Sequence, residues 1–155
     1  MHTTSETVDL NQRRQMAMHA LAHARIADVR RLVAEAGLTV EAHMLRRPET
    51  GLVTVRGRIG GGGAPFNTGE ATVTRATVKL PTGEIGHAYQ LGRDLEKARL
   101  SAALDALMQC DDVRPTVEAR IIEPLALMQR HEADQKRSET AATKVDFFTM
   151  VRGED

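Results

Sequence analysis

The sequence predicts a single α+β domain, a four-stranded antiparallel sheet with flanking helices. Three observations support this fold class. Four segments between residues 39 and 91 have strand character with no helical segment between them, which is typical of an antiparallel meander. The segments before and after them repeat apolar residues every three or four positions, as amphipathic helices do. The length of 155 residues is that of one ordinary domain.

The N-terminal part of the chain is predicted to be helical after a short irregular segment. We expect residues 1–8 to be disordered and the folded α+β domain to span residues 9–142. Apolar residues at 26, 29, 32 and 33 recur at helical spacing, and Gly37 supplies a C-terminal stop. This pattern predicts one bent helix or two short ones between residues 11 and 37.

The four predicted strands follow directly. Val40, Ala42 and Met44 alternate with polar residues in the first strand, which Pro48 is expected to close. The second and third strands are predicted over residues 51–59 and 69–80, and a Pro-Thr-Gly turn leads into a fourth over residues 84–91.

The third strand changes phase in its middle. Ala71 and Val73 share one face, but the apolar set resumes at Ala76, one position out of step. Either a β-bulge follows Thr74 or Arg75 points along the apolar face, and both arrangements are common next to functional sites.

The C-terminal part is predicted to be mainly helical. Asp94 is expected to cap a helix whose apolar stripe ends at Met108. Residues 116–122 are ambiguous between strand and helix, and Pro124 suits the first turn of a further helix. Residues 128–144 are too polar to be buried on more than a narrow face.

Composition limits the possible functions. The 21 basic residues balance 21 acidic ones, so no net field attracts nucleic acid or a membrane surface. Cys110 is the only cysteine, which excludes an internal disulfide and a cysteine-based metal centre and fits a reducing compartment. No segment has the ~20 apolar residues of a membrane span. We therefore expect a soluble, cytoplasmic protein.

No catalytic set can be named from the residues. The glycine run at 60–63 lacks the Gly-Lys-Ser/Thr of a phosphate loop, so a hairpin loop is favoured over an anion-binding nest. His19 and His23 lie one helical turn apart but have no identifiable third metal ligand. His87 is expected on the core side of its strand, as a structural or interface residue. Acidic neighbours are expected to raise the pKa of Cys110, which disfavours a nucleophile.

Arginine side chains are the candidate binding residues. Such a cluster suits a polyphosphate or the carboxylates of a partner. The alternative is a solvated sheet face with ion pairs to Glu49, Glu70 and Asp94. The candidates for substrate or anion binding are Arg46, Arg47, Arg56, Arg58, Arg75 and Arg93.

The C-terminal tail, residues 143–155, is predicted to be an extended docking segment. It contains two of the three phenylalanines of the chain, and its apolar groups would lie on both faces of an extended strand. Such a segment suits a tail packed against another subunit. The interface candidates are Phe147, Phe148, Met150 and Arg152.

Three blocks carry a resemblance to a known family. They are RPETGLVTVRGRIGGGGAPFNTGEATVTRATVKLPTGEIGHAYQLGRD, then DALMQ, then the closing TKVDFFTMVRGED. Together they resemble the PhnG family, a subunit of the bacterial carbon-phosphorus lyase system for phosphonate breakdown. The match runs from about residue 47 to residue 155.

The resemblance implies a role in a complex. Family members sit in a cytoplasmic core with PhnH, PhnI and PhnJ and work with PhnL, forming ribose 1-methylphosphonate 5-triphosphate from ATP and methylphosphonate with release of adenine. It places the nucleosidase chemistry on PhnI and the iron-sulfur cluster and S-adenosylmethionine on PhnJ, with no cofactor and no established catalytic residue on this subunit. An independent nucleotide-binding or phosphate-binding module and a hydrolase are the alternatives.

Overall fold

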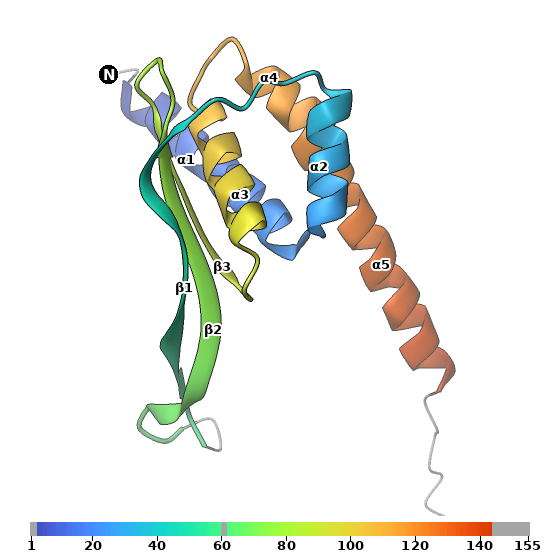
Figure 1. Ribbon diagram of the computed structural model, residues 1–155. Coiled ribbons are helices and arrows are strands. Elements are labelled where there is room, and N and C mark those ends of the chain that lie inside the picture. The colour runs from blue at the N-terminus through green and yellow to red at the C-terminus, as the bar shows by residue number, and fades with distance from the viewer. Residues whose placement is uncertain (1–2, 60–61, 144–155) are drawn as a thin grey trace, which may run out of the picture.

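The computed structural model describes residues 3–59 and 62–143 and has one α+β domain (Figure 1). Helices α1 (Thr3–His23) and α2 (Ile26–Glu35) precede three strands, β1 (His43–Gly57), β2 (Phe66–Lys79) and β3 (Ile85–Leu91). Helices α3 (Leu95–Leu107), α4 (Arg114–Val117) and α5 (Glu123–Ala142) follow, with a π-helical turn, η1 (Glu118–Ile122), between the last two. The predicted fold class is confirmed.

The sheet has three strands, so the prediction of four was wrong. The order is β1-β2-β3 and both pairs are antiparallel. The two strands predicted on either side of Pro48 are one long strand, β1. Proline is tolerated there because β1 is an edge strand, and its register against β2 is interrupted between Arg46 and Glu49.

The change of phase in β2 does not come from a bulge against β3. Residues 73–79 of β2 pair with residues 91–85 of β3 without interruption. Thr74 is buried on the side that also carries Ala76 and Val78, and its hydroxyl donates to the carbonyl of Gly92 at 2.6 Å. Arg75 therefore lies on the opposite side of the sheet, with Val73.

Helix α3 forms the centre of the domain and packs against β2 and β3. The predicted cap is confirmed, because the carboxylate of Asp94 accepts a hydrogen bond from the backbone N–H of Lys97 at 2.8 Å. Gly86 of β3 lies so close to α3 that an added Cβ would stand 1.9 Å from the carbonyl oxygen of Ala102. The apolar stripe predicted for this helix is buried: Leu100, Ala103, Leu104, Leu107 and Met108.

The N-terminal helices are two, separated at Ala24 and Arg25, as one of the two predicted arrangements required. Gly37 has a φ of +66°, the conformation expected of a glycine after a helix. Helix α1 begins at Thr3, earlier than the sequence indicated, so it includes part of the segment predicted to be disordered.

The ambiguous segment at residues 116–122 is helical. The N–H of Glu123 donates to the carbonyl of Glu118, five residues earlier, which is the bond of a π-turn. Pro124 has no N–H to bond the carbonyl four residues back, and its ring needs space there, so the wider turn fits the proline. Beyond this turn α5 projects from the body of the domain, and residues 131–143 are exposed (Figure 1).

The arrangement leaves one face of the sheet open. The helices lie on one side of the sheet, and no described helix covers the other side (Figure 1). Along β3, Gly86, Ala88 and Gln90 are buried, whereas the residues between them are exposed. Within the described ranges, no helix is long and apolar enough to cross a membrane.

Candidate functional site

The open face of the sheet is the candidate site, and strand pairing assembles it. Glu49, Arg75 and Tyr89 are direct partners across β1, β2 and β3. In the adjacent row Gly51 pairs with Val73, and Val73 pairs with Leu91. Paired residues point to the same face of a sheet, so these two rows form one surface.

Two of the predicted arginines meet at one carboxylate on this face. Arg75 donates through Nε to Glu49 at 2.7 Å, and Arg46 donates through Nη1 to the same oxygen at 3.0 Å. Hydrogen bonds from Arg46 and then Arg75 hold the pKa of Glu49 below its ordinary value. The bridge is thus complete above that ordinary value and is lost as the pH falls through the lowered pKa.

A shallow hollow of about 220 Å³ lies beside this bridge. Gly51 has no side chain, so nothing rises above the sheet beside its partner Val73, and this leaves the hollow. Val73 is buried, while Tyr89 and Arg75 stand on the rim and are exposed. The hollow therefore combines an apolar floor with a phenol and a guanidinium.

The other predicted arginines do not join this pair. Arg47 neighbours it in sequence, and Arg56 and Arg58 lie near the far end of the β1–β2 ribbon. Arg93 follows β3, just before α3. Among the residues described, none of these four has an ion pair. The predicted pairing with Glu49 is confirmed for Arg46 and Arg75, whereas Glu70 and Asp94 have no ion pair among the residues described. The role of all six arginines in binding stays a prediction.

A buried ion pair fixes the free edge of β3. Asp105 of α3 accepts from Nε and Nη2 of Arg14, both at 2.9 Å, and from the backbone N–H of His87 at 2.9 Å. The hydrogen bond to Asp105 raises the pKa of Arg14. One carboxylate thus connects α1, α3 and β3. It also accepts a hydrogen bond from an N–H at the sheet edge, which without this partner would be open to pairing with a strand of another chain.

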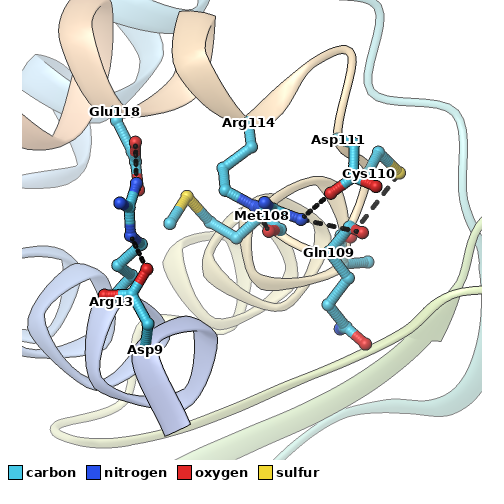
Figure 2. Close-up of polar contacts among 9 residues, drawn as sticks. Asp9, Arg13, Met108, Gln109, Cys110, Asp111, Arg114 and Glu118 are labelled. Carbon is cyan, nitrogen blue, oxygen red and sulfur yellow. Dashed lines mark hydrogen bonds and ion pairs between the residues drawn. The ribbon is translucent and has the colours of Figure 1, made fainter. Parts of the chain in front are cut away.

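A larger groove of about 910 Å³ lies between α1 and α5. Arg13 lies in its wall, bonded to Asp9 at 2.9 Å and to Glu118 of the π-turn at 3.3 Å, and Figure 2 shows these two contacts. The charge of Asp9, and then that of Glu118, raises the pKa of Arg13. Because the groove also contains Arg130 and Glu123, neither sign of charge dominates it.

Three histidines were considered in the sequence, and the position of one of them, His87, differs from the prediction. His87 is exposed on the open face, so the prediction that it faces the core was wrong. The close approach of α3 leaves space only for small residues such as Gly86 and Ala88 on the covered side. His87 Nδ1 lies 3.2 Å from the hydroxyl of Thr77. His19 and His23 have ring centroids 4.4 Å apart, and no group of three or more metal-ligating side chains occurs among the described residues.

Cys110 lies in the turn after α3 that Arg114 organises. Arg114 donates to the carbonyls of Met108 and Gln109 and to Asp111, at 2.6 Å in the last case (Figure 2). Burial, and then the charge of Glu84, raises the pKa of the Cys110 thiol. The predicted direction is confirmed, although burial is the largest cause.

Two predicted features lie wholly or partly outside the described residues. The tail candidates, from Phe147 to Arg152, fall within 144–155, and so does most of the segment assigned to docking. Residues 60 and 61 of the glycine run are also outside, but the segment joins β1 to β2, as a hairpin loop does.

Sequence reasoning missed the residues that complete the open face. Gly51, Tyr89 and Leu91 gave no signal because the local sequence around each does not show which residues lie beside it on the neighbouring strands. Only the cross-strand register, residue 51 against 73 and 73 against 91, shows that they are neighbours. The ion pair between Arg14 and Asp105 joins positions 91 residues apart, and no local pattern predicts such a pair.

Comparison with known proteins identifies the family. The family described as "Phosphonate metabolism protein PhnG" matches residues 12–153. A protein of Rhizobium meliloti (strain 1021), named alpha-D-ribose 1-methylphosphonate 5-triphosphate synthase subunit PhnG, is 51% identical over 152 residues, which cover 98% of this chain and 96% of that protein. The chain therefore belongs to the PhnG family of phosphonate metabolism proteins.

Proposed function

We propose that this chain is a subunit of alpha-D-ribose 1-methylphosphonate 5-triphosphate synthase and acts chiefly as a scaffold. The observation that carries the proposal is the 51% identity, over nearly the full length of both chains, to a relative with that name. Two chains so similar along their whole length share their fold, and a subunit name implies that other chains complete the enzyme.

The arrangement of side chains supports a scaffolding role over a catalytic one. The most prominent cation pair, Arg46 and Arg75, is already bridged by Glu49. Among the described residues, the hydroxyl–histidine contact is that between Thr77 and His87, which is exposed, and Asp105 bonds the backbone of His87 and not its ring. A nucleophile needs a base that is itself held in place by a third group.

The partners that the family resemblance implies complete the proposal. PhnH, PhnI and PhnJ would form the core complex with this chain, and PhnL would act with them. ATP would be a co-substrate of the complex, with the iron-sulfur cluster and S-adenosylmethionine on PhnJ and no cofactor on this chain. The compartment would be the cytoplasm.

Adenine release tests the proposal. The purified chain, given ATP and methylphosphonate, should release no adenine. Added to the remaining subunits, it should restore release in proportion to the amount added until the complex is saturated, as expected of an obligate subunit. Adenine release by the chain alone, abolished by a point mutation within it, would show that a catalytic site lies here and would overturn the scaffold proposal.

A further inference from the structure

We propose that the open face of the sheet is the docking surface for another subunit of the synthase, one that presents an apolar side chain surrounded by carboxylates. This inference rests on the proposed function, because it requires that the synthase contains other subunits to which this chain binds. It assigns the face, the chemistry of the partner and the residues that distinguish this face from the rest of the surface.

The first observation is the apolar character of the open face. Tyr89 is 59% exposed inside the β2–β3 pairing, and Leu91, in the last pair of that register, is 74% exposed. Of the eleven exposed large hydrophobic residues in the described ranges, four share this face by the strand register: Val55, Ile85, Tyr89 and Leu91. Exposed apolar side chains that gather on one face of a sheet, instead of occurring singly over the surface, mark an interaction surface.

The second observation is the hollow beside Gly51. Its floor is Val73, and Tyr89 and Arg75 stand at its rim. Hot spots at protein interfaces are aromatic or arginine side chains next to pockets that a partner side chain fills. A volume of about 220 Å³ is sufficient for one large apolar side chain, whereas it is smaller than the ~300–1,000 Å³ of a typical small-molecule site.

The third observation is charge. The open face carries three cationic side chains, Arg46, Arg75 and Lys79, against one anionic side chain, Glu49. The chain as a whole has a net charge of zero, so the excess is local to this surface. Complementary charge steers association and fixes register, so the partner should be acidic around its apolar contact.

A second copy of this chain fits less well. Two copies joined through this face by a twofold axis would place the same cationic excess on both sides of the interface. Like charges across an interface are unfavourable. Self-association therefore becomes an outcome that the experiment can detect.

The test uses two substitutions and a matched control in the full-length chain. Leu91→Asp places a charge in the apolar patch. Gly51→Val fills the hollow, and no atom lies within 4 Å of the added Cβ, so the strand itself should accept it. The control, Leu127→Asp, makes the same change at a leucine that is 67% exposed but lies on α5. Urea unfolding of each variant checks that it is folded.

Each tagged variant is titrated against the other synthase subunits, and the apparent Kd is measured. We expect Leu91→Asp and Gly51→Val to weaken binding by at least about 30-fold, as for loss of an interface anchor, and Leu127→Asp to bind like the unchanged chain. If the unchanged chain binds and both open-face variants bind equally well, the docking surface lies elsewhere and the proposed function still stands.

The remaining outcomes are also distinct. If the unchanged chain binds none of the other subunits, the proposed function fails, and this inference fails with it. If the unchanged chain alone forms a dimer that Leu91→Asp converts to a monomer, the occupant is a second copy and the proposed partner is wrong. If Leu127→Asp weakens binding as much as Leu91→Asp does, the effect is not specific to the open face and the inference is overturned.

Discussion

At the scale of single residues, Cys110 is held as a thiol by its surroundings. Burial raises its pKa, and the nearby carboxylate of Glu84 adds to the effect. Only the thiolate reacts with alkylating agents, so a raised pKa lowers the reactive fraction at neutral pH. We expect iodoacetamide to react with Cys110 more slowly at pH 7.5 than with a free cysteine peptide, with the midpoint of the pH–rate curve above the peptide value.

Removing the charge of Glu84 provides the control for Cys110. Glu84→Gln should move the midpoint toward lower pH, because one cause of the raised pKa is gone, while burial remains. A curve for the unchanged chain that coincides with that of the peptide would contradict the account.

Among the carboxylates that form ion pairs in the described residues, we expect the loss of Asp105 to lower the free energy of unfolding most. Its side chain is 4% exposed and accepts from Arg14 and from the backbone of His87. Asp105→Ala leaves a partly buried guanidinium and an edge N–H without partners. We expect a loss of about 2–4 kcal/mol in the free energy of unfolding, measured with urea, somewhat below the range for fully buried pairs.

An exposed pair offers the comparison for Asp105. Asp134 pairs with Arg137 on α5, and both side chains are more than half exposed. Asp134→Ala should change stability by no more than ~0.5 kcal/mol, since surface pairs contribute little. Equal losses at positions 105 and 134 would mean that the buried network does not stabilise the sheet edge.

The residue scale also shows what the sequence could and could not predict about the site. It offered ion pairing with Glu49 as one interpretation of the arginines, and Arg46 and Arg75 do pair with that residue, although the break expected at Pro48 would have left Glu49 outside both neighbouring strands. It could not predict which arginines meet, since that depends on the register between β1 and β2. The sequence assigned His87 to the core because His87 shares a face with the apolar residues Ile85 and Tyr89. That face is the open one, because α3 lies so close to β3 that the covered face carries small residues such as Gly86 and Ala88.

At the scale of elements, the sequence predicted helix ends that depend on nearby residues, but it did not predict that β1 continues through a proline. Asp94 acts through a side chain that bonds a nearby N–H, Gly37 and Pro124 act through their own backbone, and each of the three lies at a helix end as expected. Pro48 was expected to end a strand, but an edge position with an irregular register accepts a residue without an N–H. Whether a strand is at an edge is a property of the whole sheet.

Gly86 shows how closely α3 and β3 depend on each other. Gly86→Ala would place a Cβ 1.9 Å from the carbonyl oxygen of Ala102 and 2.5 Å from the nitrogen of Ala106. Both atoms belong to a helix backbone, so the helix itself must move. We expect a loss of at least about 1–3 kcal/mol in the free energy of unfolding, measured by urea denaturation.

Gly69 in β2 is the matched control for Gly86. No atom lies within 4 Å of a Cβ at that position, so Gly69→Ala should be neutral or slightly stabilising. If the two substitutions have the same effect, the close packing of α3 on β3 does not need glycine.

At the scale of the whole molecule, the open face and the C-terminal end of α5 point to two separate places of contact. The open face lies on the side of the sheet away from the helices, whereas α5 leaves the body on the helical side (Figure 1). The 20 residues of α5 span about 30 Å, and residues 131–143 are exposed. This exposed, polar part of α5 contributes no residue to the described core.

The tail prediction follows from this geometry. In the described part of the chain, the buried core residues extend from Ala17 to Leu125. Removing residues 145–155 should therefore leave the unfolding midpoint unchanged and abolish co-purification with the other synthase subunits. The anchors would be Phe147, Phe148 and Met150, where truncation of a buried aromatic costs ~2 kcal/mol or more.

Point variants separate the apolar anchors from the length of the tail. Phe147→Ser combined with Phe148→Ser should reproduce the loss of assembly, whereas removal of residues 153–155 alone should not. Two linked contacts bind far more tightly than either one, so loss of the tail should also weaken a complex whose open face is intact. If the chain without residues 145–155 assembles as fully as the intact chain, the tail is not a docking segment, and the open face alone must hold the subunit in the complex.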